Sequence, residues 1–522
     1  MEGAGLPPLA GMRRVSGDAA RSLIEAQLTA HGDGILSVFG RYRLADAFPA
    51  WHGTIRAVEE FINIPWFGID DPRVEARLRS MPLDHRLMSN IEPTFRTIRK
   101  ILSPRFEAGV VSRYLQTMLQ TAAIAIAFKM HGQAAFGPGI TLDTVGAAVD
   151  YFQSRRRHMV SLLYTMPFAC GGTDALVPLD TLNVLLPQVE HSCVAITGFH
   201  LKLAQLEALD TFSLEVDEIG AMASHEFDTL DDYFLEPERA SIHVMGELRR
   251  DQIVMPRMEP LDPKKIFSAA ELRNSVKLIG ATYAAFGLND SDFSTMALLI
   301  TAFSRHARDD YFVEIEKPKF QAMLRAQSVF DPGELEGLLV NAPSGYATNS
   351  NAYEPFIDVG DAVVSNVNLL SRFLYVFKNV HLGSRRRFQI HAGFIFEDMV
   401  KRDLSTLGFH VTDIKRINRK EFDVVTTHRD AIYNFQCKNN WIDLSKVESD
   451  RALFVRYNRS LTNYYRRALQ KELKREDLLK GELGLEKIEH YVISRFPVIG
   501  ADARVINYNQ IGRLKALVGD AS

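Results

Sequence analysis

The segments HAGFIFEDMVKRDLSTLGFHV (391–411), EFDVVTTHRD (421–430) and AIYNFQCKNNWID (431–443) decide how the C-terminal part of this chain folds. The first segment has a helical pattern that ends at Gly408, a residue type that commonly follows the last turn of a helix. The other two alternate apolar and polar residues around a short polar turn, as half-buried strands do. We therefore expect a helix followed by three strands, the first of which starts at Phe409.

Strand alternation predicts which side chains share a face of this sheet. In the second strand, Phe422 and Val424 should point to one face and Asp423 to the other. In an antiparallel hairpin, Asp423 would then lie beside two residues of the third strand, Gln436 and Lys438. The alternative is an ordinary surface ion pair, which is common where an Asp and a Lys occupy neighbouring strands.

The predicted helix carries a carboxylate, Glu397, beside an apolar side that includes Phe394 and Val400. A carboxylate in such a position is costly to bury unless it has a partner such as a metal ion or a lysine. If this helix packs over the strand face that holds Asp423, it brings Glu397 to the same point. The backbone carbonyl of Cys437 would lie nearby.

These groups suit metal-assisted cleavage of a phosphodiester bond. Mg²⁺ prefers hard oxygen ligands and keeps several waters, so we expect it, or Mn²⁺, as the cofactor. Asp423, Gln436, Glu397 and the Cys437 carbonyl are the predicted metal ligands, with Asp423 bridging the metal and the scissile phosphate. Lys438 would orient or help to deprotonate the attacking water and stabilise the phosphate. The predicted catalytic residues are Asp423, Gln436, Lys438 and Glu397.

The order F-E, then F-D-V-V, then Q-C-K resembles the PD-(D/E)XK nuclease superfamily. The closest likeness is to its Mrr-type restriction endonuclease catalytic domain, which has glutamine where most members have Asp or Glu. The resemblance covers residues 386–500 and implies a core of helix, three-stranded meander, helix and strand. It further implies a Mg²⁺-dependent DNA endonuclease in restriction or other anti-phage defence, acting as a homodimer if it cuts both strands. The alternatives are a structure-selective repair nuclease and a degenerate nuclease fold that binds nucleic acid without cutting it.

An Arg- and Tyr-rich helix is expected at 451–475, directly after the predicted catalytic strand. Arginines can contact phosphates, and tyrosines can stack on bases, so this helix is a candidate DNA-binding face. The alternative is a solvated amphipathic helix. The predicted nucleic-acid-binding residues are Arg456, Arg459, Arg466, Arg467, Tyr464 and Lys471.

The net charge of −3 hides an asymmetry between the two parts of the chain. Residues 385–522 contain 26 Lys and Arg against 18 Asp and Glu, whereas the remainder contains 35 and 46. A basic C-terminal part suggests a polyanionic partner, although the charges of domains also scatter by several units. The acidic remainder would contact a protein partner or regulate the basic domain.

The remaining sequence predicts a mainly α-helical N-terminal body in front of a C-terminal α/β restriction-endonuclease-like domain. The stretch PRMEPLDPKK (256–265) is the best candidate linker. We expect a helical domain at 1–260, a second helical subdomain and connector at 261–385, and the nuclease domain at 386–522. The run SRRRH (154–158) could bind phosphate, but such runs more often form a solvated helix face, which we expect here.

Three cysteines, Cys170, Cys193 and Cys437, have neither the number nor the spacing of a disulfide framework or a zinc site. The N-terminus lacks the apolar core of a signal peptide. The most apolar stretches, 121–130 and 158–172, are shorter than the roughly 20 residues of a membrane span. We therefore expect a reduced, cytoplasmic protein without membrane segments.

Overall fold

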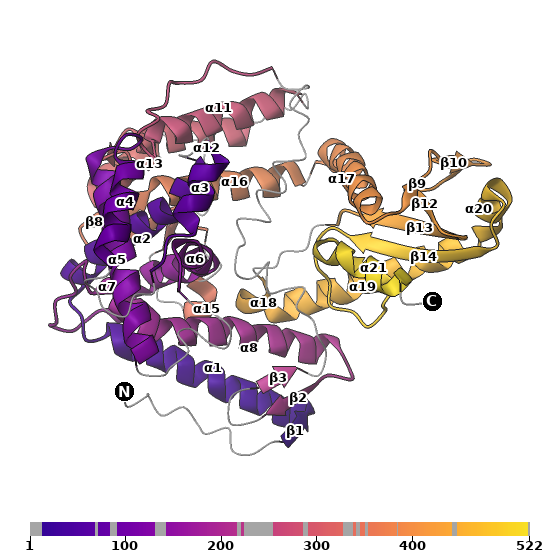
Figure 1. Cartoon of the computed structure of the whole chain (residues 1–522), viewed down its shortest axis with the longest axis horizontal. Coiled ribbons are helices and arrows are strands. Elements are labelled where there is room, and N and C mark those ends of the chain that lie inside the picture. Colours follow the sequence, from indigo (N-terminus) through magenta and orange to yellow (C-terminus); the bar gives the residue numbers. More distant parts are fainter. Residues whose placement is uncertain are drawn as a thin grey trace. The chain divides into compact units, whose positions relative to one another are not determined.

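A computed structural model describes most of the chain (Figure 1). The described residues are 13–67, 71–83, 91–130, 142–216, 221–223, 254–285, 291–326, 338–340, 345–349, 353–383, 385–440 and 446–519. Residues 441–443, at the end of the predicted catalytic strand, lie outside them.

The chain folds into two compact units that exchange segments in the sequence. The described residues of Leu28–Thr197 and Ile253–Lys378 form the first unit. Those of Pro7–Gln27, Gly198–Gln252 and Asn379–Ser522 form the second. The stretch 256–265, expected to be a linker, therefore lies inside the first unit, and the second unit recruits two segments from the N-terminal half of the chain.

The first unit is mainly helical, as the sequence predicts. Its core forms where α2 packs against α5 and α6, around fully buried aromatic rings such as Trp51 and Phe152. The indole Nε1 of Trp51 donates to the Met159 carbonyl at 3.0 Å, so this large side chain keeps its hydrogen bond in the core. The described helices with residues in this unit are α1 (Gly17–Phe39), α2 (Leu44–Phe67), α3 (Pro72–Arg79), α4 (Glu92–Leu102), α5 (Ala108–Met130), α6 (Val145–Ala169), α7 (Thr181–Val184), the π-helix η2 (Leu185–Val189), α8 (Glu190–Ala208), α11 (Ala269–Ala285), α12 (Ser291–Ser304), α13 (Lys317–Ala326), α15 (Tyr346–Asn349) and α16 (Val367–Gly383).

A five-stranded sheet accompanies these helices, in the order β4-β5-β8-β7-β6. Its central strand β8 is antiparallel to both neighbours, and four of its five residues are buried. The strand bounds are β4 (Ala307–Arg308), β5 (Phe312–Glu316), β6 (Leu339–Val340), β7 (Phe356–Asp358) and β8 (Ala362–Asn366).

The expectation of a solvated face at 154–158 is wrong. Arg155 and Arg157 are 6% and 1% exposed, and His158 is fully buried. Arg155 pairs with Glu190, and Arg156 lies 2.7 Å from Glu59. Buried arginines require such acidic partners, and these come from other helices, so the run joins α6 to its neighbours.

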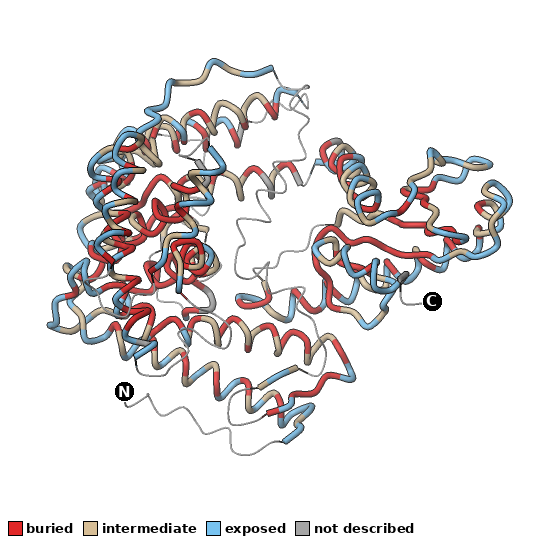
Figure 2. The backbone as a smooth tube through the Cα atoms, viewed as in Figure 1, coloured by how far each residue is buried: buried red, intermediate tan, exposed pale blue. Residues whose placement is uncertain are grey.

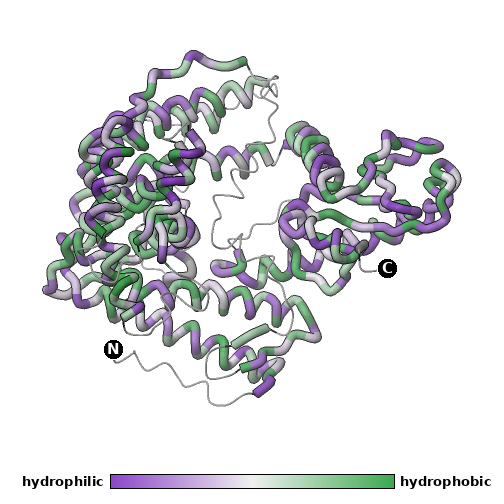
Figure 3. Tube along the Cα trace, viewed as in Figure 1, coloured by the Kyte–Doolittle hydropathy of each residue, from purple (hydrophilic) through white to green (hydrophobic). Residues whose placement is uncertain are grey.

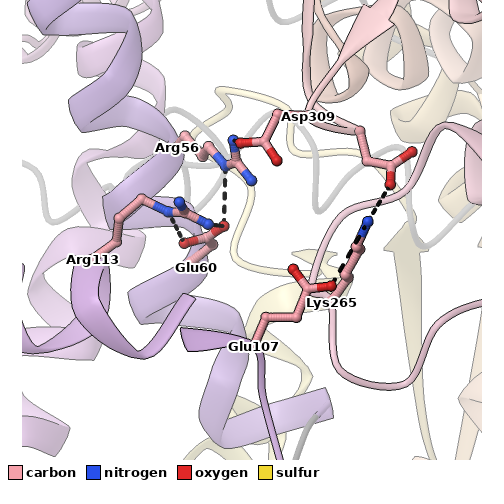
Figure 4. Close-up of polar contacts among 7 residues, drawn as sticks. Arg56, Glu60, Glu107, Arg113, Lys265 and Asp309 are labelled. Atoms are coloured by element: carbon pink, nitrogen blue, oxygen red, sulfur yellow. Dashed lines mark hydrogen bonds and ion pairs between the residues drawn. The ribbon is translucent and has the colours of Figure 1, made fainter. Parts of the chain in front are cut away.

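A second ion-pair network lies in the first unit (Figure 4). Arg113 donates two hydrogen bonds to Glu60, at 2.7 and 2.8 Å, and Arg56 donates a third to the same carboxylate at 3.1 Å. Arg56 also pairs with Asp309. Lys265 lies 3.8 Å from Glu107 and 2.7 Å from Asp310, so the end of the stretch 256–265 is held against this unit.

The second unit combines a mixed sheet with helices on both faces. Its sheet has the order β15-β14-β13-β12-β9, in which β12 is antiparallel to β9 and β13, while β14 is parallel to β13 and β15. A smaller antiparallel sheet has the order β1-β2-β3. The further elements of this unit are β1 (Arg13–Ser16), β2 (Ser213–Val216), β3 (Ala221–Ala223), α17 (Arg386–Thr406), β9 (His410–Val411), β10 (Arg416–Ile417), β11 (Lys420–Glu421), β12 (Val424–His428), β13 (Ala431–Lys438), α18 (Lys446–Ser449), α19 (Arg451–Leu473), α20 (Glu476–Leu483), β14 (Lys487–Ser494), β15 (Val505–Asn507), the 3₁₀-helix η5 (Tyr508–Arg513) and α21 (Leu514–Gly519).

The central strands of this sheet are buried on both faces (Figure 2). On one face, Phe396 and Val400 of α17 pack against Phe435 of β13. On the other face, α19 approaches β14, where the Tyr465 hydroxyl lies 3.1 Å from the Ser494 hydroxyl. Polar and apolar residues alternate along α19 (Figure 3), as expected for a helix with one buried side.

The predicted packing of the helix at 391–406 is wrong in one respect. We expected it over the strand face that holds Gln436, but α17 covers the opposite face, which holds Tyr433 and Phe435. The physical reason is the chemistry of the two faces. Tyr433 and Phe435 offer an apolar surface, whereas Asn434, on the Gln436 face, needs the hydrogen bond that it donates to Glu472 of α19.

No helix in the described parts of the chain combines the length and the apolar character that crossing a bilayer requires.

Candidate functional site

Asp423 stands in a bend immediately before β12. The bend interrupts the expected alternation, because Phe422 packs with Val425 while Val424 packs on the other face with Phe435. Asp423 therefore does not occupy a regular strand position. Its Oδ2 accepts a hydrogen bond of 2.9 Å from the backbone N–H of Cys437, which ties the bend to β13.

Lys438 and Gln436 lie beside Asp423. The Lys438 Nζ is 3.8 Å from the Asp423 Oδ2 and donates to the Gln436 Oε1 at 3.1 Å. The side chains of Lys438 and Asp423 are only 14% and 23% exposed, so this is not a solvated surface pair. Gln436 is buried, and its Nε2 has no hydrogen-bond partner among the described residues.

Glu397 reaches the same place from α17. Burial, and after it the negative charge of Asp423, raise the pKa of Glu397 to about 7. Burial also raises the pKa of Asp423, against the lowering effect of Lys438 and the Cys437 N–H. The negative charge of Asp423 thus disfavours the ionisation of Glu397, and the nearby Lys401 and Lys438 offset this effect and burial only in part.

These two carboxylates could hold a divalent metal ion. No cluster of three or more His, Cys, Asp or Glu side chains suited to a metal occurs in the part of the chain that the structure describes. Mg²⁺ does not need one, because it is often held by one or two carboxylates and retains several waters. A cation at Glu397 and Asp423 would offset both the burial and the repulsion by Asp423 that raise the pKa of Glu397. The Gln436 amide oxygen and the Cys437 carbonyl belong to the adjacent strand β13.

Sequence reasoning missed a buried polar network behind this site. Asn434 donates to Glu472 at 2.9 Å and lies 3.1 Å from the His490 Nδ1. Arg475 donates to the same carboxylate at 2.8 Å and stacks over Phe422, 4.5 Å from the ring centroid. The network anchors α19 to β13 two residues before Gln436. Only the pairing of distant strands and helices assembles it, so no local signal could have identified it.

Two further residues near the site differ from expectation or were overlooked. Arg495, 4% exposed, donates its backbone N–H to the Lys438 carbonyl at 2.9 Å and its side chain to Asn439 at 3.0 Å. It therefore fixes the end of β13 directly after Lys438. Phe394, expected on the apolar side of α17, is 57% exposed instead, whereas Phe396 is fully buried.

The basic residues predicted on α19 all lie on its exposed side. Arg456, Arg459, Arg466, Arg467 and Lys471 are exposed, as is Tyr464, which is 48% exposed. The Lys438 Nζ lies 5.9 Å from the centroid of the Tyr464 ring, so this helix borders the lysine of the candidate site directly.

Comparison of the chain with models of protein families, with curated proteins and with solved structures finds no match.

Proposed function

We propose that this protein is a metal-dependent DNA endonuclease whose active site consists of Glu397, Asp423, Gln436 and Lys438. The observation that carries the proposal is the meeting of two carboxylates with raised pKa values and one lysine at the end of β13. A strongly raised carboxylate pKa, as at Glu397, beside specific charged groups is typical of functional sites. The order α17, β9, β12, β13, α19, β14 supports a fold like that of PD-(D/E)XK nucleases.

In this proposal Glu397 and Asp423 would hold Mg²⁺ or Mn²⁺, together with the Gln436 amide oxygen and the Cys437 carbonyl. The bound metal would neutralise charge on the phosphate and lower the pKa of a coordinated water. Lys438 donates hydrogen bonds to the attacking water and to the phosphate oxygens that gain charge. Gln436 positions Lys438 through its 3.1 Å contact with Nζ. Arg456 and Arg467, which are exposed on α19, supply contacts to DNA phosphates.

The test is cleavage of plasmid and of linear DNA by the full chain with Mg²⁺ or Mn²⁺, and with EDTA. Asp423→Ala and Lys438→Ala should abolish cleavage. The same unit offers a matched control, because Asp430 and Lys487 form an Asp–Lys pair of 2.6 Å at the opposite end of β13 and β14, where both are exposed. Asp430→Ala and Lys487→Ala should cleave as the unchanged protein does. Cleavage that survives either site variant would refute the assignment.

A further inference from the structure

We infer that the side of α19 that carries Tyr457 and Tyr464 binds an unpaired DNA strand and leads it to Lys438. The inference rests on the proposed function for the choice of DNA as the ligand. Four features of α19 support it. These are the sign of its exposed charges, the spacing of its exposed side chains, the hydrogen-bond partners of its cations, and the distance of Tyr464 from Lys438.

The exposed side of α19 carries charge of one sign. The sole carboxylate in Arg451–Leu473 is Glu472, which is fully buried and held by Asn434 and Arg475. The exposed charged residues of the helix are all arginine or lysine. Such a surface attracts a polyanion and has no acidic group that would repel one.

The side chains on this surface divide into two edges of the helix. Tyr457, Tyr464 and Lys471 follow one another at intervals of seven residues, which places them on one stripe. Arg459 and Arg466, also seven residues apart, form a second stripe roughly 150° away around the helix axis.

The two edges also differ in what their cations contact. Arg459 donates to the Glu207 backbone carbonyl at 3.4 Å, and Arg466 donates to the Asn463 side chain at 3.0 Å. No hydrogen bond or ion pair with the described residues involves Lys471 of the tyrosine stripe, Arg467 beside that stripe, or Arg456 midway between the two stripes. Their charges are therefore available to a ligand.

The tyrosine stripe, and not the arginine stripe, reaches the candidate active site. Tyr464 lies against Lys438, with 5.9 Å between Nζ and the ring centroid. The neighbouring Tyr465 is fully buried and its hydroxyl lies 3.1 Å from that of Ser494, so the backbone at this point is fixed on the sheet. Tyr464 is 48% and Tyr457 42% exposed, and each presents a ring to solvent.

Exposed rings among free cations suit unpaired nucleotides. Aromatic side chains stack on the faces of bases in single strands, with little dependence on sequence. In a duplex those faces are covered by neighbouring base pairs, and only base edges are accessible in the grooves. Tyr457 and Tyr464 are about 10 Å apart along the helix, which exceeds the 3.4 Å spacing of stacked bases. The two rings therefore accept separate bases of an extended strand.

The test is binding of a fluorescently labelled oligonucleotide, single-stranded or annealed to its complement, measured by anisotropy. All proteins carry Asp423→Asn and are kept in EDTA, so binding is read without cleavage. Single-stranded DNA should bind more tightly than the duplex. Replacing Tyr457 and Tyr464 by leucine should weaken single-strand binding by about fivefold to a hundredfold for each ring, whereas replacing them by phenylalanine should preserve it.

The two edges of α19 provide the matched control. R467A/K471A should weaken binding and reduce its salt dependence, whereas R459A/R466A should change both much less. Unchanged binding by the leucine variant, equal affinity for single strand and duplex, or equal losses from both edge variants would overturn the inference. A protein that binds in this way but does not cleave DNA with Mg²⁺ would refute the proposed function and leave this inference intact.

Discussion

In the first unit, Glu60 is 1% exposed and accepts hydrogen bonds from two arginines, Arg113 and Arg56 (Figure 4). In the second unit, Glu397 is half-buried, but no arginine or lysine forms an ion pair with it in the described residues. Its nearest influences are burial and the like charge of Asp423. Both sites remove carboxylates from water at least in part, and only the first provides ion-pair partners for its carboxylate.

This difference distinguishes carboxylates that stabilise the fold from carboxylates that can bind a ligand. A buried carboxylate in a bidentate pair with arginine holds helices in register and has no capacity left for a ligand. A pair of partly buried carboxylates whose nearby lysines do not offset the cost of burial remains electrostatically unfavourable until a cation binds. The second arrangement is the one that we expect where a protein binds metal. Functional sites characteristically retain uncompensated charges that the rest of a fold avoids.

The largest effect is expected when the candidate active site of the second unit loses a carboxylate. Asp423→Asn should reduce DNA cleavage by about a thousandfold or more, equivalent to roughly 4 kcal/mol of transition-state stabilisation. It should leave the metal-free fold as stable as before, or more stable, because the substitution removes a charge that burial disfavours. Cleavage rates and urea denaturation in EDTA measure the two quantities. A large loss of stability would place Asp423 among the structural charges.

Glu60→Ala is the complementary substitution in the first unit. It leaves Arg113 without its bidentate partner and Arg56, 7% exposed, with Asp309 alone. Removing one partner of a buried ion pair costs about 3–5 kcal/mol of folding free energy. Chemical denaturation measures the loss, and Glu92→Ala, which breaks an exposed pair with Arg96, is the control expected to change little. A mild effect of Glu60→Ala would show that the network contributes little stability.

Two phenylalanines of α17 differ in burial and should therefore differ in their contribution to stability. Phe396 is fully buried between α17 and the sheet, whereas Phe394 is 57% exposed. Phe396→Ala should cost about 3 kcal/mol or more of folding free energy, because it opens a cavity in the core. Phe394→Ala should change it by less than about 0.5 kcal/mol. Similar losses in the two variants, measured in urea, would contradict the assigned orientation of α17.

Much of the second unit follows from local patterns in the sequence. Alternation along AIYNFQCK assigns Gln436 and Lys438 to one face, and their 3.1 Å contact agrees with it. The helix ending before Gly408 also follows, because Gly408 adopts φ +94°, which favours glycine. The mainly helical first part of the chain is likewise evident from its periodicity.

Local patterns do not reveal partners that are distant in sequence. The burial of Arg155 depends on Glu190, and the half-buried Arg156 pairs with Glu59; both glutamates belong to other helices. Which strand face α17 covers depends on the hydrogen bond between Asn434 and Glu472, which lies 38 residues later in the chain. The bend at Asp423 breaks the period of two on which face assignment rests, so the prediction for Phe422 and Val424 failed there.

The smallest expected effect is a pH dependence of stability that Glu397 should produce in the absence of metal. The folded protein holds the pKa of this group at about 7, above its ordinary value of 4.5. A raised pKa means that the fold binds the proton more tightly than the unfolded chain does. The resulting stability is therefore complete below pH 4.5 and is lost as the pH rises toward 7. After allowance for partial exposure, the loss should be on the order of 1–3 kcal/mol.

Urea denaturation in EDTA across this pH range measures the effect. Glu397→Gln should abolish the Glu397 contribution, whereas Asp398→Asn should keep most of it, because the neighbouring Asp398 side chain is 51% exposed. Mg²⁺ should restore stability above pH 7 in the unchanged protein and not in Glu397→Gln, since a ligand that binds only the folded state stabilises it. Equal pH profiles for the unchanged protein and Glu397→Gln would mean that Glu397 is as well compensated as Glu60, and the contrast between the two units would disappear.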